Sequence, residues 1–314
     1  MKIIMIGGGG FIGSHLAPEL SAHEVIAVDS LMVNNIYAEE PFGEPHSGIL
    51  RDRIANYAGR LIIADARNYN ILSPICKAAK PDVMIHLAAI AHQGKAQKNP
   101  HTTFDHSLRT LENALDIAVN LNVKRFVYFS SSTVYGDWPE SGIVDETAPC
   151  APKGIYGSLK LAGELLVKAY SEAYGLEYTI IRPSALYGPG CVSGRVIQRF
   201  IEKASQGQPV SATGEALDFT YVSDLVMGVG LAVKSPNAVN QTYNLTFGEA
   251  RPVMNAAMLV ANHYRVPVYF VPRDETFADR GTLCVDKARK DFGYSPMFAL
   301  EKGIPQYIEW FDGL

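Results

Sequence analysis

The chain has 314 residues, 47% of them hydrophobic and 19% charged, with a net charge of −4, which suits one large globular unit or two closely joined ones. It has neither a basic stretch of the kind that binds nucleic acid nor an acidic tail that would form a disordered arm. It also lacks a run of roughly 20 apolar residues that could cross a membrane and a signal-peptide cleavage site, so we expect a cytoplasmic protein without nucleic-acid or membrane partners.

Strand-like and helix-like segments alternate along the first 180 residues. Six short runs are apolar almost throughout, as in strands buried on both faces: 2–7, 24–29, 61–65, 83–88, 125–131 and 178–183. Helical stretches lie between most of them, over 12–20, 70–79, 102–121 and 156–174. This alternation predicts an α/β fold with a Rossmann-type, doubly wound parallel sheet.

Two regions depart from this alternation. The segment 30–60 holds two prolines and three glycines, so we predict mostly loop with one helical turn at most. After residue 183 the pattern becomes irregular, with a helix near 194–206. We therefore expect a first domain over 1–183, to which a segment near 218–246 returns. A smaller α/β subdomain over 184–314 would cover the carboxyl edge of the sheet, where such folds bind ligands.

The stretch "IMIGGGGFIG" falls on the turn between the first predicted strand and helix. Gly7, Gly10 and Gly13 have the spacing for a tight turn, a close backbone approach to a pyrophosphate and close helix–strand packing. Asp29 ends the next strand, where a carboxylate binds ribose hydroxyls and favours NAD over NADP. Asp65, which ends the third strand, could meet the adenine edge. For both carboxylates, an ordinary turn aspartate remains the alternative.

Tyr156 and Lys160 stand at i and i+4 of a predicted helix, so their side chains share one face. A phenol with its usual pKa of about 10 is a poor base, but a nearby ammonium lowers that pKa and lets the pair move a proton. Ser131 closes the 125–131 strand and could orient the reacting oxygen of a substrate. A solvated helix pair and a serine turn are the structural alternatives.

Together these motifs resemble those of extended short-chain dehydrogenases/reductases, in particular the nucleotide-sugar epimerase/dehydratase family. The matching segments follow the family's order over nearly the whole chain: "GGGGFIGSHL", "VIAVDSL", "HLAAIAHQ", "FVYFSSSTVYG", "YGSLKLAGE", "IIRPSALYGPG", "LDFTYVSDL" and "KARKDFGYSP". The resemblance implies that Tyr156 is the base, Lys160 its tuning partner and a nicotinamide-ribose contact, and Ser131 the substrate-orienting hydroxyl.

The resemblance also implies a bound NAD, and we interpret 1–183 as the NAD-binding domain and 184–314 as mainly substrate-binding. The predicted NAD contacts are Gly7, Gly10, Phe11, Ile12, Gly13, Asp29, Asp65, Ala88, Ala89, Tyr156 and Lys160. Gly8 and Gly9 are interpreted as variable positions that only ease the turn. His86, in the "HLAA" segment, is equally well explained as a buried strand end.

In this family the tyrosine removes a hydroxyl proton while hydride passes to NAD, and the fate of the resulting keto sugar separates the members. Dehydratases carry an Asp-Glu pair directly after the catalytic hydroxyl residue, where this chain has Ser132 and Thr133. Hydroxyls cannot serve as an acid–base pair near neutral pH. The sequence thus favours an epimerase, most simply at C4. A dehydratase or lyase, a dehydrogenase or reductase, and a non-catalytic NAD sensor remain alternatives.

Three positions depart from the family pattern. Ala185 and Leu217 stand where an asparagine and an arginine usually touch the nucleotide's phosphates, and Ser107 stands where an asparagine near the nicotinamide is common. A substrate other than a standard diphosphonucleotide sugar therefore stays open, as do the sugar, the nucleotide and the inverted carbon. The candidate substrate contacts are Ser132, Arg195, Arg199 and Arg280, although a single arginine is also compatible with a solvated surface charge.

Metal and cysteine chemistry are not expected. The spacing of His92, His101 and His106 does not place them on one helix face, so we predict no metal site. The cysteines are far apart and form no CxxC pair, and neither Cys150 nor Cys191 matches the position of the cysteine used by sugar 3,5-epimerases. We expect reduced, non-catalytic thiols.

The helices predicted over 102–121 and 156–174 carry apolar residues at helical spacing. Packing against the chain's own sheet explains most of this pattern. In relatives, two such helices form a four-helix dimer interface. The resemblance therefore implies a homodimer.

Overall fold

The computed structural model describes residues 1–32, 46–91, 93–138, 142–192, 194–272 and 278–314. Its centre is a seven-stranded parallel sheet with the strand order β12-β7-β5-β4-β1-β2-β3. The strands are β1 (Lys2–Ile6), β2 (Glu24–Asp29), β3 (Arg60–Ile63), β4 (Val83–His86), β5 (Arg125–Phe129), β7 (Tyr178–Arg182) and β12 (Gln241–Asn244). All six predicted strands belong to this sheet, and the predicted α/β fold is confirmed.

The order of the strands reverses at β1, which lies between β2 and β4. Ile3 pairs with Val25 on one side and with Val83 on the other, and all three side chains are buried. The loops that follow the neighbouring strands β1 and β4 therefore lead away from each other. Such a switch point leaves a crevice at the carboxyl edge of the sheet, where ligands bind in this class of fold.

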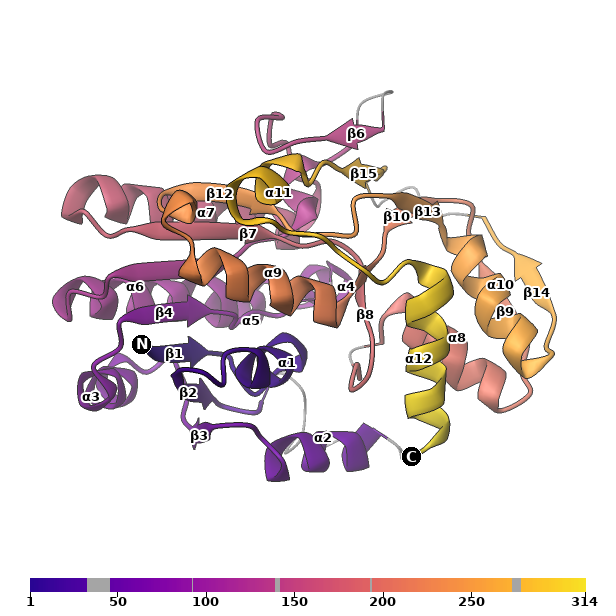
Figure 1. The fold of residues 1–314 in the computed structure, drawn as a ribbon, viewed down its shortest axis with the longest axis horizontal. Coiled ribbons are helices and arrows are strands. Elements are labelled where there is room, and N and C mark those ends of the chain that lie inside the picture. The colour runs from indigo at the N-terminus through magenta and orange to yellow at the C-terminus, as the bar shows by residue number, and fades with distance from the viewer. Residues whose placement is uncertain (33–45, 92, 139–141, 193, 273–277) are drawn as a thin grey trace.

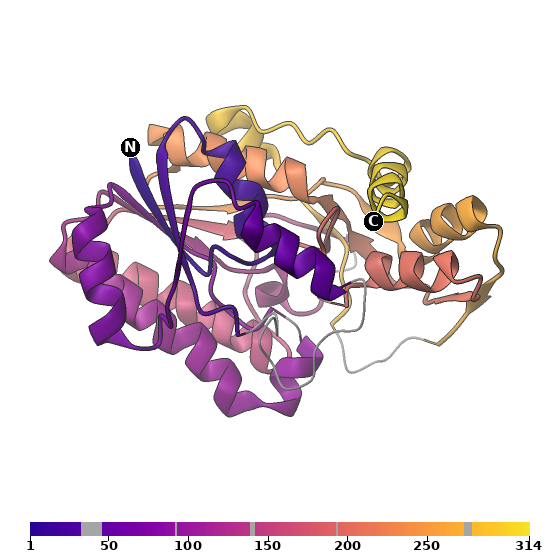
Figure 2. The same ribbon diagram turned by 90° about the horizontal axis from the view of Figure 1, so that it is seen from below.

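Helices cover both faces of the sheet (Figures 1 and 2). On one face, α1 (Phe11–Glu19), α9 (Val222–Lys234) and α11 (Asp286–Phe292) pack against the strands. On the other lie α3 (Tyr69–Ala79), α6 (Thr110–Asn120) and α7 (Gly154–Tyr174). Among the described helices, none combines the length and apolarity needed to cross a membrane.

The helix predicted over 102–121 begins as α5 (Pro100–Phe104), continues through one π-helical segment (Asp105–Arg109) and ends as α6. The short helix α4 (Gln93–Lys98) precedes it.

The prediction of at most one helical turn over 30–60 is wrong, because α2 (His46–Ala55) is a ten-residue helix. Its residues Ile49 and Leu50 are buried with Val192 from a distant loop, and Trp310 packs against them. Most of the stability of a short helix comes from such tertiary packing. The prolines and glycines of the segment, which suggest a loop, do not report this packing.

Part of the C-terminal region lies beyond the carboxyl ends of the strands (Figure 1). The helices α8 (Val196–Ser205), α10 (Val253–Tyr264) and α12 (Leu300–Asp312) share a core there. Four two-stranded sheets complete this region: β8 (Leu186–Tyr187) with β11 (Thr220–Tyr221), β9 (Val210–Ala212) with β14 (Val268–Phe270), β10 (Ala216–Asp218) with β13 (Ala250–Pro252), and β15 (Thr282–Leu283) with β6 (Ile143–Val144).

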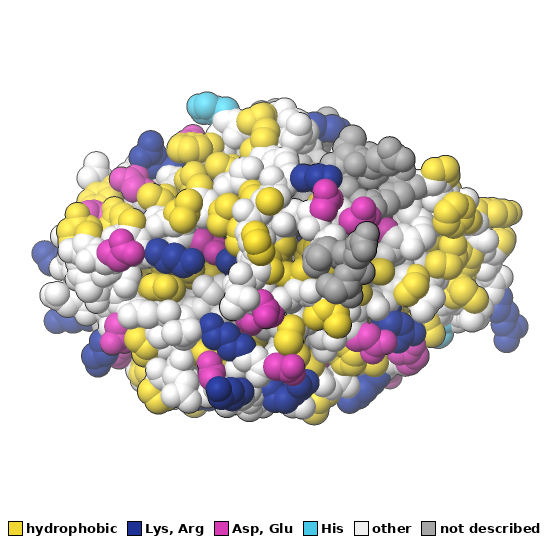
Figure 3. Space-filling view, turned by 90° about the horizontal axis from the view of Figure 1, so that it is seen from above, with side chains coloured by type: hydrophobic (Ala, Val, Ile, Leu, Met, Phe, Trp, Pro, Cys, Tyr) yellow, Lys and Arg dark blue, Asp and Glu magenta, His cyan; other side chains and the backbone are white. Residues whose placement is uncertain are grey.

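The segment 218–246 supplies α9 and β12, which pack with the central sheet. The division of the chain at residue 183 stays a prediction. On the face shown in Figure 3, the acidic and basic side chains of the described residues are interspersed rather than gathered by sign.

Candidate active site

Two adjoining cavities lie at the carboxyl edge of the sheet. The β1 cavity, about 540 Å³, is bounded by the loops after β1, β2, β3 and β4. The β5 cavity, about 480 Å³, is bounded by the loops after β5 and β7 and by α8 and β10. Both are lined by Ile12, Leu87, Ala89, Ala91 and Arg195. One extended ligand, or two ligands in contact, can therefore occupy them together.

Several glycines of the loop leave no room for a side chain. Gly7 has a φ of +82°, and a Cβ there would lie 2.5 Å from the Ala88 nitrogen. A Cβ at Gly13 would overlap the Gly8 carbonyl, and one at Gly8 would lie 2.6 Å from the Ala27 Cβ. The interpretation of Gly8 as a variable position is therefore wrong, because it faces the neighbouring strand.

Gly9 is also close to the end of β2: a Cβ there would lie 3.1 Å from the Asp29 Cβ, and its amide donates to Oδ2 of Asp29 over 2.9 Å. The second carboxylate oxygen of Asp29 accepts a hydrogen bond from the Leu31 amide over 2.7 Å. Burial raises the pKa of Asp29, and these two bonds oppose the rise. The carboxylate thus ties the glycine loop to the end of β2 while it lines the β1 cavity, so its turn role and its predicted ribose role are compatible.

Asp65 likewise has two roles available. It lines the β1 cavity and pairs with Arg67, whose Nη2 lies 2.6 Å from its Oδ2. Burial works against the charged form, but the hydrogen bonds from Arg67 hold the pKa of Asp65 below its ordinary value. The pair keeps this carboxylate ionised at the adenine end of the predicted site.

The β1 cavity fits a dinucleotide. The first turn of α1 carries no acidic residue and Gly10 provides no side-chain cap, so the helix N-terminus is suited to a phosphate. The alanines after β4 leave room beside it. Eight of the predicted NAD contacts line the cavity: Gly7, Gly10, Phe11, Ile12, Asp29, Asp65, Ala88 and Ala89. Gly13 packs beneath the loop, and Lys95 and His106 are lining residues that the sequence did not indicate.

His86 has a structural role at the buried end of its strand, as one of its two interpretations predicts. It is 1% exposed, and its Nε2 lies 3.1 Å from Oγ1 of Thr110. Burial lowers the pKa of His86 to about 3. The imidazole is therefore neutral and supports the end of β4.

Ser131, Tyr156 and Lys160 come together in the β5 cavity. The Ser131 side chain is close enough to Tyr156 to oppose the rise in the pKa of its hydroxyl. The Ser131 hydroxyl also accepts from the amide of Thr133 over 3.2 Å and from its hydroxyl over 3.0 Å. Lys160 donates to the Phe129 carbonyl over 2.6 Å, and its Nζ lies 6.0 Å from the centre of the Tyr156 ring. The end of β5 thus positions all three groups.

The expected lowering of the tyrosine pKa by Lys160 is not what the structure shows. Enclosure by the protein raises the pKa of Tyr156, and the groups that oppose this rise are Arg195, Ser131 and Arg280. Burial lowers the pKa of Lys160 to about 8, against the influence of Glu164. The Lys160 ammonium is bonded to the Phe129 carbonyl, and Arg195 and Arg280 are the charged groups that oppose the rise in the pKa of Tyr156.

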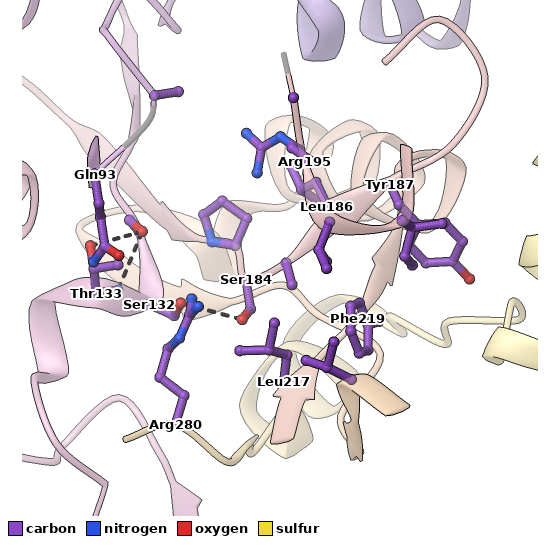
Figure 4. A pocket seen from close by; sticks show the side chains of 18 of the residues that line it. Gln93, Ser132, Thr133, Ser184, Leu186, Tyr187, Arg195, Leu217, Phe219 and Arg280 are labelled. Atoms are coloured by element: carbon purple, nitrogen blue, oxygen red, sulfur yellow. Dashed lines mark hydrogen bonds between the residues drawn. The ribbon is translucent and has the colours of Figure 1, made fainter. Parts of the chain in front are cut away.

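The two positions after Ser131 are occupied by bonded hydroxyls. Ser132 donates to Ser184 over 3.3 Å, and Thr133 donates to Ser131. All four side chains line the β5 cavity (Figure 4). Sequence reasoning missed Ser184, although it lies within a segment that matches a family motif.

The predicted substrate contacts Ser132, Arg195, Arg199 and Arg280 all line the β5 cavity. Figure 4 shows Arg195 and Arg280 reaching into it from different elements. Ala185 and Leu217 line the same cavity, so both departures from the family pattern lie in its wall. Ser107 instead is buried within the π-helical segment.

A buried polar network lies behind these residues. Glu164 accepts from Ser130 over 2.5 Å and pairs with Arg182 over 2.6 Å. Arg182 donates to the Tyr135 hydroxyl over 2.8 Å, and that hydroxyl donates to Asn244 over 2.7 Å. The network joins α7 to β5, β7 and β12, and no single segment of the sequence indicates it.

In the part of the chain that the structure describes, no group of three or more histidine, cysteine, aspartate or glutamate side chains could hold a metal. His92 lies outside the described residues. The Cys191 thiol is buried and lies 3.6 Å from Oε1 of Gln198, and Cys150 lies 3.4 Å from Nη2 of Arg182. Both thiols thus have structural contacts.

Comparison with known proteins gives consistent matches over the whole chain. It is 28% identical over 333 residues to the uncharacterized UDP-glucose epimerase YtcB of Bacillus subtilis, covering 100% of this chain and 99% of that protein. It is 27% identical to a dTDP-glucose 4,6-dehydratase of Streptomyces niveus, covering 99% and 93%. The solved structure of Thermus thermophilus UDP-glucose 4-epimerase in complex with NAD superposes with a TM-score of 0.86 at 25% identity, covering 100% and 99%.

The model of the NAD dependent epimerase/dehydratase family matches residues 3–246. That span holds both cavities' principal loops and the residues Ser131, Tyr156 and Lys160. The chain therefore belongs to the NAD dependent epimerase/dehydratase family.

Proposed function

We propose that this protein is an NAD-dependent nucleotide-sugar epimerase that inverts C4 of the sugar. The family and the relatives support an enzyme of this class. The observation that favours epimerisation over dehydration is the pair of hydroxyls at Ser132 and Thr133, which are bonded to Ser184 and Ser131. No carboxylate stands at either position to assist the loss of water.

In this proposal NAD lies in the β1 cavity, held by the glycine loop, Asp29 and the N-terminus of α1. When bound, it supplies an acceptor for a hydride that can later be given back to the other face of the sugar. The protein's part is to bind and orient both molecules. The cofactor and the sugar are proposed to meet where the two cavities adjoin, at the residues that line both of them.

Tyr156 is the proposed proton acceptor for the C4 hydroxyl and the donor when that oxygen is protonated again. Ser131 is proposed to hold the same oxygen beside the phenol, since both residues line the β5 cavity. The positive charges of Arg195, Arg280 and Lys160 favour the phenolate that forms. Lys160 is also proposed to contact the nicotinamide ribose.

The remaining site residues are proposed to bind the nucleotide sugar: Ser132, Arg195, Arg199 and Arg280. We further propose a homodimer built through the helices over 102–121 and 156–174 as a four-helix bundle. The exposure of Leu165 and Phe104, 60% and 46%, supports an interface on this side. The four free thiols support a reducing, cytoplasmic setting.

Incubation with a panel of UDP-, GDP- and dTDP-sugars, followed by NMR, tests the reaction. An isomer that differs only at C4, formed without net NADH, is the expected product. A product lighter by one water would establish the dehydratase alternative, and steady NADH formation would establish a dehydrogenase. NAD binding without turnover of any sugar would favour the alternative of a non-catalytic NAD sensor.

A further inference from the structure

The face of α7 that carries Tyr156 and Lys160 continues with Glu164. The three residues stand four apart in the helix, so their side chains follow one another along the same face. Glu164 is 0% exposed, and the proposed reaction gives it no part. A buried carboxylate one turn beyond Lys160 therefore needs a separate explanation.

Lys160 and Glu164 hold two consecutive residues at the end of β5. The Lys160 ammonium donates to the Phe129 carbonyl over 2.6 Å. Oε1 of Glu164 accepts from the Ser130 hydroxyl over 2.5 Å. The next residue is Ser131, so the chain enters the β5 cavity from two points that the same helix fixes.

The backbone of this segment is bonded separately to the neighbourhood of β7. The Ser130 amide donates to the Ile181 carbonyl over 2.8 Å, and the Ser132 amide donates to the Pro183 carbonyl over 2.9 Å. These bonds do not involve the Ser130 hydroxyl. A variant that lacks this hydroxyl thus keeps the path of the segment and loses only its tie to α7.

Glu164 also places a negative charge beside Lys160. Burial lowers the pKa of Lys160 to about 8, and Glu164 opposes this effect. Burial raises the pKa of Tyr156 and of Tyr128, whose ring centre lies 5.2 Å from the Lys160 Nζ, and lowers the pKa of His86 to about 3. These three neighbours are therefore uncharged at pH 7, and the carboxylate is what favours the ammonium.

Stability alone does not explain a carboxylate at this position. Arg182 binds both oxygens of Glu164, with 2.8 Å from Nε to Oε1 and 2.6 Å from Nη2 to Oε2. A buried ion pair of this kind is often no more stabilising than apolar residues of the same volume. Unlike an apolar residue, however, Glu164 can accept from Ser130 and can favour a nearby positive charge.

We propose that Glu164 is a positioning residue of the active site. Its bond to Ser130 sets the strand end that carries Ser131, and its charge stabilises the Lys160 ammonium. Glu164 is not among the residues that line either cavity, so it acts through these neighbours. The inference rests on the proposed roles of Ser131, Tyr156 and Lys160.

Glu164→Gln tests the charge, because the amide oxygen can still accept from Ser130. Without the carboxylate the pKa of Lys160 should fall further, and a neutral lysine does not favour a phenolate. For the sugar found with the substrate panel, we expect kcat to be lower by about tenfold or more at about pH 8.5 but by less than about threefold at about pH 6. A loss that is the same at both pH values would overturn the role of the charge.

Glu172→Gln is the matched control, since it changes an exposed carboxylate of the same helix and should match the wild type at both pH values. Glu164→Gln leaves Arg182 without its partner, which is costly for a buried charge. If that variant does not fold, the double variant of Glu164→Gln with Arg182→Met removes both charges and should show the same pH-dependent loss.

Ser130→Ala tests the hydrogen bond, because it removes the hydroxyl and keeps the charge of Glu164. A small displacement of Ser131 should lower kcat by about tenfold, while the pH profile and the KM for the sugar stay close to those of the wild type. An unchanged kcat would show that Ser130 does not set the position of Ser131.

Urea unfolding needs no substrate and separates this inference from the proposed reaction. Because the folded-state pKa of Lys160 lies below its unfolded value, stability rises with pH between the two values. This rise should begin at a lower pH in Glu164→Gln than in the wild type, and should be absent when Lys160→Met is added. A rise that begins at the same pH would refute the inference in an active epimerase too. A displaced rise without turnover of any sugar would refute only the proposed function.

Discussion

Tyr156 is the residue on which the proposed chemistry depends, and its hydroxyl is its only acid–base group. Tyr156→Phe keeps the ring and removes that hydroxyl, so we expect kcat to fall by about 10²–10⁴-fold. Eight of the eleven predicted NAD contacts line the β1 cavity, and NAD affinity should stay within a few-fold of wild type. Steady-state rates and a fluorescence titration of NAD measure the two effects. An unchanged rate would exclude Tyr156 as the base.

Lys160 illustrates a cost in stability at the active site. Its folded-state pKa, about 8, lies below the ordinary value of 10.5, so carrying the charge in the folded protein costs roughly 3 kcal/mol. Lys160→Met removes this cost but also the hydrogen bond to Phe129, worth about 1 kcal/mol. We expect a gain in unfolding free energy of about 1–2 kcal/mol at pH 7 and a large loss of activity.

The pH dependence of stability provides the control for this prediction. Between pH 8 and 10.5 the unfolded chain binds the Lys160 proton more tightly than the folded protein does. Wild-type stability therefore gains a contribution as pH rises through this window. Urea unfolding across the window should show that contribution in the wild type and lack it in Lys160→Met. If the unfolding free energies of the wild type and of Lys160→Met changed in parallel with pH, the lowered pKa of the buried lysine would be contradicted.

Among the elements, α7 is held in place by close packing and by a buried ion pair. A Cβ at Gly163 would overlap the Tyr128 hydroxyl, so this helix approaches β5 as closely as a backbone can. The Arg182 and Glu164 side chains, 4% and 1% exposed, join the helix to β7. The first two turns of the same helix carry Tyr156 and Lys160, whose placement thus depends on both contacts.

Breaking this pair from one side should be costly. Arg182→Met leaves Glu164 buried without its partner, and we expect a loss of about 3–5 kcal/mol in unfolding free energy. The double variant Glu164→Gln with Arg182→Met removes both charges and should recover part of that loss. Urea unfolding of the two single variants and the double variant forms the required cycle. Strictly additive losses would show that the pair is not coupled.

At the scale of elements, the sequence predicted what is locally encoded. The apolar runs predicted the six strands, and the glycine spacing predicted the turn that contacts the β1 cavity. It did not predict α2, whose burial depends on Val192 and Trp310 from distant segments. It also missed the network of Arg182, because its members come from four elements. Lys203 lines the β5 cavity, and the sequence could have indicated it as a site residue, since it continues the i, i+4 spacing of Arg195 and Arg199.

For the whole molecule, the proposed dimer makes a direct prediction. Leu165 lies on α7 and is 60% exposed, and a charge there should disfavour burial between two copies. Leu165→Glu should halve the mass measured by light scattering. Met297→Glu is the matched control, because Met297 is 58% exposed but lies near α12. A monomeric wild type, or equal effects of both variants, would contradict the four-helix interface.

Reaction specificity is a property of the whole site and was only partly readable from the chain. The positions of Ser132 and Thr133 could be compared with a motif, but their bonds to Ser184 and Ser131 required the fold. The sequence likewise indicated Arg195 and Arg280 as candidates. Only their joint effect on the pKa of Tyr156 distinguishes them from Arg199, and the two arginines come from segments some 85 residues apart.

The position of β12 has a consequence for synthesis on the ribosome. This strand covers the edge of β7, yet about 60 residues separate the two in the chain. At 5–20 residues per second, the nascent sheet waits roughly 3–12 s with a strand edge unpaired. Such an edge is a template for pairing between chains. Slow translation of this stretch should therefore favour aggregation of newly made molecules, whereas the finished protein has that edge covered.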